Sequence, residues 1–183
     1  MNKLYDAAQA VNSRSAGFAP DRSMSSQDLV HAVLGDITLD LGFGGRGCQS
    51  SHLGTTTCNP ADMDVGLLLH EFGHHFDWGL GGGPSADLAE GEITDTAGNH
   101  VTGKDPDIED FQRTFSGYRC SSVPCVYAGK KHPQWNTPYE DFADMYSNWT
   151  TRGFADDIGG AGSARNIWME VHMPGWLAEI FGP

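Results

Sequence analysis

The sequence predicts an α+β fold, in which a small mixed sheet lies beside a central helix and the C-terminal part of the chain is helical. Residues 62–78 and 137–149 repeat apolar side chains at helical spacing, whereas 36–41 alternates polar and apolar residues as a strand does. At 183 residues and without an internal repeat, the chain is expected to form one domain. We expect an N-terminal lobe over about 1–82, a C-terminal lobe over about 83–183 and a cleft between them.

The remaining elements follow from the same periodicities and from the positions of glycine and proline. In chain order we predict helices at 3–12 and 25–35, the strand at 36–41, a turn at 42–47, the helix at 62–78, a glycine-rich loop region to about 133, the helix at 137–149 and a last helix at 163–173. Pro174 is expected to break that last helix and to leave residues 176–181 as a short apolar tail.

The helix at 62–78 has two different faces. Asp62 is the candidate N-cap, and Asp64 favours the first turn through the helix dipole. The glycines after Trp78 and then Pro84 should end the helix. His75 lies off the face of His70 and His74 and is expected to be a packing or surface residue. The apolar face carries Val65, Leu68, Phe72 and Phe76. The opposite, polar face carries His70, His74 and Asp77.

The polar face contains an H-E-x-x-H box, formed by residues 70–74. Side chains four residues apart are neighbours on a helix, so the imidazoles of His70 and His74 can bind one metal ion. Neutral imidazoles suit Zn²⁺, and Glu71 can reach a water molecule at such a metal. The alternative is that the two histidines are solvated and bind no metal, but it leaves the position of Glu71 unexplained.

Two imidazoles do not complete a zinc site, so a third ligand is needed. The metzincin spacing would need glycine at Asp77 and histidine at Leu80, which excludes that class. A carboxylate from a later helix is the common alternative. In the helix at 137–149, Glu140 and Asp144 lie opposite an apolar stripe. Glu140 can bind the metal, and Asp144 can accept a hydrogen bond from a ligand imidazole.

Two other interpretations of the third ligand stay open. Thr137 and Glu140 also have the spacing of a helix capping box, which explains this glutamate without any metal. Glu92 follows His74 by a spacing that is similar to that of the thermolysin-like glutamate ligand. It lies, however, in a glycine-rich stretch that is typical of a loop or a short strand.

The two blocks, residues 70–77 and 140–146, resemble the zinc peptidase domain of anthrax lethal factor and the bacterial Pro-Pro endopeptidases. The resemblance implies a zincin-like fold of the gluzincin type and a zinc endopeptidase. It implies that His70, His74 and Glu140 bind Zn²⁺, that Glu71 is the general base, and that Asp77 and Asp144 support the ligands.

One feature of the family pattern is absent from this chain. The family has a tyrosine shortly before the glutamate ligand that steadies the oxyanion, and the corresponding position here falls near Pro133. Tyr127, His132 and Tyr139 remain the candidates for that role.

In the expected reaction, a zinc-activated water attacks a peptide carbonyl and Glu71 moves the proton to the leaving nitrogen. The strand near 37–41 would bind the backbone of a protein or peptide substrate by edge pairing. One alternative is a non-catalytic metal-binding or adhesive domain, which would not need Glu71. The other is a different zinc amidohydrolase such as a peptide deformylase, whose E-G-C-x-S block is absent.

The charge and the cysteines restrict the partners and the compartment. A net charge of −13 argues against nucleic acid and anionic membranes, and no apolar run has transmembrane length. The acidic runs 59–64 and 105–110 are expected to be solvated loops rather than calcium sites. Cys48 with Cys58 and Cys120 with Cys125 suggest two short-range disulfides. They predict a secreted chain without its signal peptide; reduced core thiols are the alternative. We also expect the protein to act as a monomer.

Overall fold

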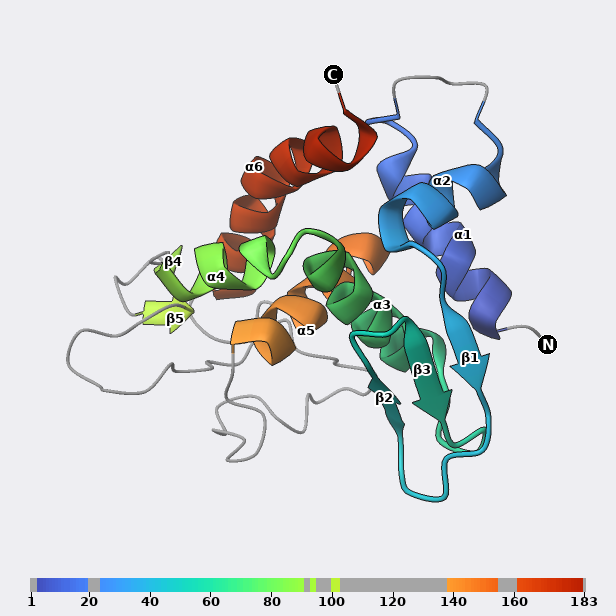
Figure 1. Ribbon diagram of the computed structural model, residues 1–183. Helices are drawn as coiled ribbons and strands as arrows, with labels where there is room; N and C mark the ends of the chain where they lie inside the picture. The colour runs from blue at the N-terminus through green and yellow to red at the C-terminus, as the bar shows by residue number, and fades with distance from the viewer. Residues whose placement is uncertain are drawn as a thin grey trace.

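The computed structural model describes residues 3–19, 24–90, 93–94, 100–102, 138–154 and 161–182, and this part of the chain is mixed α and β (Figure 1). Its helices are α1 (Lys3–Ser15), α2 (Ser26–Leu34), α3 (Val65–Gly79), α4 (Gly83–Glu90), α5 (Pro138–Thr151) and α6 (Ala161–Phe181). Its strands are β1 (Thr38–Asp40), β2 (Cys48–Ser50), β3 (Thr55–Cys58), β4 (Ile93–Thr94) and β5 (His100–Thr102). The α+β class is therefore confirmed.

Helices α3 and α5 form the centre of the fold and pack along each other (Figure 1). Every residue of α3 from Leu67 to Asp77 is buried, so the helix is covered on its polar side as well as on its apolar side. The Phe76 ring lies 5.1 Å from the Tyr146 ring and 6.1 Å from the Phe142 ring of α5. The predicted stripe on α5 is thus the core contact, and the opposite face of α3 is enclosed inside the protein.

A glycine allows α3 and α5 to approach closely. A Cβ atom on Gly73 would lie 2.7 Å from the Cα atom of Ala143 and 3.0 Å from its carbonyl oxygen. Those neighbours are backbone atoms and cannot turn away as a flexible side chain can. Gly73, the residue of the H-E-x-x-H box just before His74, therefore sets the distance between the two helices.

We expect Gly73→Ala to lower the free energy of unfolding by about 1–3 kcal/mol, because overpacking a tight contact costs more than the roughly 1 kcal/mol of helix propensity that alanine gains. Urea denaturation measures the change. Gly79→Ala is the matched control, since nothing lies within 4 Å of a Cβ atom there. A Gly73→Ala protein as stable as the Gly79→Ala protein would contradict the close helix contact.

The three-stranded sheet has the order β1-β3-β2 and is mixed. β1 pairs parallel with β3, and β2 pairs antiparallel with β3. Backbone hydrogen bonds from Asn59 to Gly47 and from Ser51 to Thr55 flank the β2–β3 pairing. Since hydrogen-bonded and non-hydrogen-bonded pairs alternate, Cys48 opposite Cys58 and Ser50 opposite Thr56 are non-hydrogen-bonded pairs.

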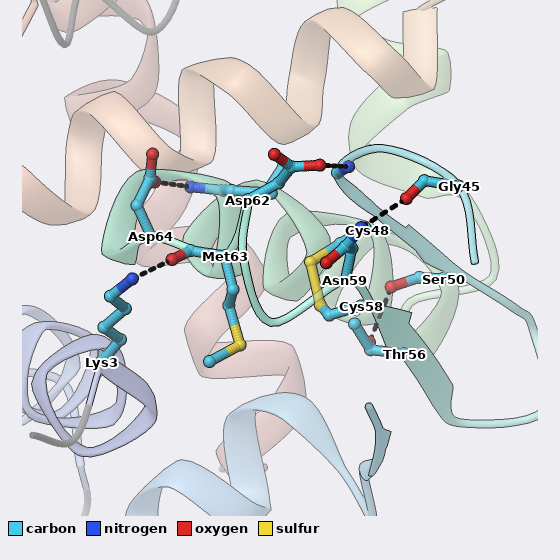
Figure 2. The surroundings of a disulfide bond; sticks show 12 residues. Lys3, Gly45, Cys48, Ser50, Thr56, Cys58, Asn59, Asp62, Met63 and Asp64 are labelled. Carbon is cyan, nitrogen blue, oxygen red and sulfur yellow. Dashed lines mark hydrogen bonds between the residues drawn. A yellow bond between two sulfur atoms is a disulfide. The ribbon is translucent and has the colours of Figure 1, made fainter. Parts of the chain in front are cut away.

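The Cys48–Cys58 disulfide joins β2 to β3, as Figure 2 shows. The two Cα atoms are 4.1 Å apart, which is the short spacing expected of a non-hydrogen-bonded pair. This predicted disulfide is confirmed. Cys120 and Cys125 lie outside the described residues, so the second disulfide stays a prediction.

We expect the double variant Cys48→Ala/Cys58→Ala to lose about 2–3 kcal/mol of unfolding free energy, because the bridge closes a short loop that the unfolded chain would otherwise sample freely. Chemical denaturation of the oxidised proteins measures this loss. Thiol titration of unfolded, unreduced wild-type protein should detect neither Cys48 nor Cys58. Equal stability of the two proteins would contradict the expected contribution.

The start of α3 differs from the sequence prediction. Asp64, and not Asp62, is the N-cap, and its carboxylate accepts the Leu67 amide at 2.8 Å. Asp62 instead accepts the Gly47 amide at 3.0 Å and so joins the loop before α3 to the start of β2 (Figure 2). Both aspartates were plausible caps by residue type, and only the tertiary contact with Gly47 separates them.

Two further predictions were wrong. Residues 83–90 form helix α4 rather than a loop, and α6 continues through Pro174 to Phe181 rather than ending there. Proline removes one helical hydrogen bond, but Met173, Trp176 and Leu177 on either side of it are buried in the core. A buried ion pair between Asp141 and Arg165 also joins α5 to α6. Packing therefore keeps the helix continuous.

No helix in the described part of the chain is both long and apolar enough to cross a membrane.

Candidate metal centre

Three predicted ligands converge where α3 meets α5. His70 Nε2 lies 3.2 Å from His74 Nε2 and 3.2 Å from Glu140 Oε2, and His74 Nε2 lies 3.5 Å from Glu140 Oε1. Ligands held at 2.0–2.2 Å around a tetrahedral zinc ion are separated by about 3.3–3.6 Å. Within the described part of the chain, these three side chains form the group of His and carboxylate residues that could hold a metal ion, with one ligand atom from each lying within 4.8 Å of the others. The distance between the two imidazole nitrogens is close to the zinc spacing, and the two His–Glu140 distances are to different carboxylate oxygens.

Asp144 orients one of the two imidazoles. Its Oδ1 atom lies 2.6 Å from His70 Nδ1, and both side chains are almost fully buried. A carboxylate there favours the tautomer with the proton on Nδ1, which leaves Nε2 with a lone pair facing His74 and Glu140. The helical spacing of Glu140 and Asp144 therefore places a ligand and its supporting carboxylate on one face of α5.

A cavity of about 1030 Å³ opens beside these ligands and contains the predicted base. Glu71 lines it together with His70, His74 and Glu140, although the Glu71 side chain is only 3 % exposed. The wall from the sheet comes from β2 and the preceding loop, with Gly47, Cys48, Gln49 and Ser50. The strand predicted to bind substrate, 37–41, does not line this cavity, because β1 is at the opposite edge of the sheet.

Aromatic side chains surround His74 at the cavity. The Trp78 ring stacks on the His74 ring, with the two ring centroids 5.4 Å apart. The His52 ring also contacts Trp78, at 4.1 Å between centroids. Tyr139, which is 45 % exposed, has its ring 5.9 Å from that of His74. Tyr139 is thus the described oxyanion candidate that the fold brings to the site.

Asp77 supports the backbone beside the site. Its carboxylate accepts the Ser85 amide at 2.8 Å, at the start of α4. Burial raises the pKa of Asp77, and the hydrogen bonds from Ser85 counteract that rise. Asp77 was predicted to support the ligands, and the hydrogen bond that the structure gives it holds the start of α4 against the end of α3.

His75 packs on the side of α3 that faces the sheet, as predicted for a residue off the ligand face. Its Nε2 atom lies 2.8 Å from Oγ1 of the fully buried Thr56. Burial lowers the pKa of His75 to about 4. The imidazole is therefore neutral at physiological pH.

Several predicted residues lie outside the described part of the chain. These are Tyr127 and His132, the oxyanion candidates; Thr137, the other half of the capping box; and Glu92, the rival ligand. Conversely, sequence reasoning missed the cavity residues Ser50, His52 and Trp78. Helical spacing from His74 is a signal for Trp78, whereas Ser50 and His52 are brought to the site by strand pairing alone.

No family model, no curated protein and no solved structure matches this chain. The case for a function therefore depends on the geometry of the site.

Proposed function

We propose that this protein is a zinc-dependent endopeptidase with a zincin-like fold. The observation that carries the proposal is the convergence of His70, His74 and Glu140, whose ligand atoms lie within 4.8 Å of one another beside a cavity that Glu71 also lines. A structural explanation of Glu140 as a helix cap gives no reason for its carboxylate to lie between two imidazoles. The Asp144–His70 contact adds the carboxylate partner that zinc-binding histidines usually have.

The chemistry follows from these positions. A bound zinc ion supplies a Lewis acid that lowers the pKa of water to about 7. His70, His74 and Glu140 hold the ion, and Asp144 keeps His70 in the tautomer that can bind it. The Glu71 carboxylate accepts a proton from the attacking water and delivers it to the nitrogen of the leaving amine. Tyr139 is the described side chain suited to donate a hydrogen bond to the oxyanion.

The free edge of β2 suits an extended peptide. The backbone groups of Gly47 and Ser51 point to β3, so those of Cys48 and Ser50 point away from it. Within the described residues no strand pairs with this outer edge. A substrate backbone can pair with Cys48 and Ser50 while its scissile bond reaches the ligands. We therefore assign the substrate-binding role to β2 in place of residues 37–41.

The alternatives explain less of the site. A purely metal-binding or adhesive domain needs neither Glu71 nor a cavity next to the ligands. A zinc amidohydrolase for small substrates does not need the exposed strand edge. The Cys48–Cys58 disulfide is compatible with the proposed extracellular setting. We further propose that the protein acts as a monomer on proteins or peptides.

The proposal is tested by metal removal. The zinc-loaded protein should cleave a denatured, carboxymethylated protein, and a chelator should abolish cleavage because the three ligands cannot activate water alone. One equivalent of Zn²⁺ should restore the activity, and magnesium should not, since it prefers oxygen ligands. Mass spectrometry of the fragments measures cleavage. A protein that binds one zinc ion tightly and cleaves no peptide would favour the non-catalytic domain.

A further inference from the structure

A buried chain of hydrogen-bonding side chains connects the helix of the ligands to the strand at the cavity. His75 Nε2 lies 2.8 Å from Thr56 Oγ1, and Thr56 Oγ1 lies 2.8 Å from Ser50 Oγ. The first residue of this chain directly follows the ligand His74. The last is on β2 and lines the cavity. Figure 2 shows the contact between Ser50 and Thr56 next to the disulfide.

The geometry points to a positioning role for this chain, which we call the Ser50–Thr56–His75 chain. We propose that it fixes the position of the β2 edge relative to the metal ligands on α3, and so positions an extended substrate along β2. The inference rests on the proposed function, because it needs a peptide bound along β2. It assigns Ser50, Thr56 and His75 as positioning residues that do not touch the reacting atoms.

Two observations support the assignment. Thr56 is fully buried and His75 is 5 % exposed, so two polar groups occupy core positions that apolar side chains would fill at lower desolvation cost. Cys48 and Ser50, whose backbone groups face outward, are the β2 residues whose side chains are tied to β3, one by a disulfide and one by this chain.

The test compares two variants that each lose one buried threonine hydroxyl. Thr56→Val removes the middle of the chain, and Thr150→Val removes a hydroxyl that donates to the Tyr146 carbonyl on α5, away from β2. Two substrates are used with each zinc-loaded protein. One is a decapeptide around a cleavage site mapped with the denatured protein. The other retains only two residues on each side of that site and is too short to follow β2.

We expect Thr56→Val to raise KM about tenfold for the decapeptide, the equivalent of about 1.4 kcal/mol of binding, and to leave the short peptide within about twofold. Thr56→Ser should restore the wild-type KM, because it retains the hydroxyl. Thr150→Val should leave the values for both peptides unchanged. A Thr56→Val protein with wild-type KM for the decapeptide, or with equal losses on both peptides, would overturn the proposal.

Hydrogen exchange gives a measurement that does not depend on activity. The Ser51 amide, which donates to Thr55, should exchange about tenfold faster in Thr56→Val, whereas the Leu68 amide of α3 should be unchanged. Ser50→Ala should give the same pattern and replaces Thr56→Val if that protein does not fold. A wild-type protein that cleaves nothing overturns the proposed function and this inference together. An active wild type with no difference between Thr56→Val and Thr150→Val overturns this inference alone.

Discussion

Replacing Glu71 with glutamine is expected to reduce kcat by about 10²–10⁴-fold, the usual contribution of a positioned general base. The amide has nearly the same shape as the carboxylate but cannot accept a proton from water. Glu71 directly follows His70 and lines the same cavity as the three proposed ligands. Steady-state hydrolysis of the mapped peptide measures the loss.

The design needs proof that the variant still holds its metal. Glu71→Gln should bind one zinc ion with nearly wild-type affinity, since the proposed ligands are His70, His74 and Glu140. Glu179→Gln on the exposed side of α6 is the control for a charge change far from the site. Near-normal hydrolysis by zinc-loaded Glu71→Gln would remove Glu71 from the mechanism.

Replacing Glu140 with alanine is expected to lower zinc affinity by more than about a hundredfold. Losing a group that only hydrogen-bonds to a metal ligand costs about 10–100-fold. Glu140 Oε2 lies 3.2 Å from His70 Nε2 and Glu140 Oε1 lies 3.5 Å from His74 Nε2, and alanine would leave two of the three proposed ligands. Competition with a chromophoric chelator measures the affinity. A role in capping alone predicts full zinc binding and a loss of about 1 kcal/mol in stability.

Glu92→Ala is the matched comparison for that experiment. It removes the glutamate whose distance from His74 in the sequence resembles that of a thermolysin-like ligand. The zinc stoichiometry and the zinc affinity should both stay unchanged. If Glu92→Ala empties the site and Glu140→Ala does not, the third ligand is Glu92 and the proposed pairing of α3 with α5 at the metal is wrong.

The sequence was informative about the site wherever local periodicity determines which side chains share a face. The spacing of His70 and His74, and that of Glu140 and Asp144, can be recognised on isolated helices. His70, His74 and Glu140 line the same cavity, and the buried Asp144 contacts His70 from behind it. The class of the fold was predictable for the same reason, because apolar stripes and alternation are local properties.

The parts that sequence reasoning missed depend on contacts between distant segments. Asp62 and Asp64 are equally good caps until Gly47 takes one of them as a hydrogen-bond partner. Pro174 should end a helix unless tertiary packing outweighs its local cost, as it does here. The role of β2 at the cavity depends on strand order, which alternation along a single strand does not contain.

The contact between His70 and Asp144 joins residues 74 positions apart in the chain. A ligand set divided in this way cannot exist before α3 docks on α5, so closing that long loop must precede tight metal capture. The rate of metal uptake during refolding would therefore report the rate at which the two helices dock. In a cell, a nascent chain would carry only a weak two-histidine site until residues beyond 140 had left the ribosome.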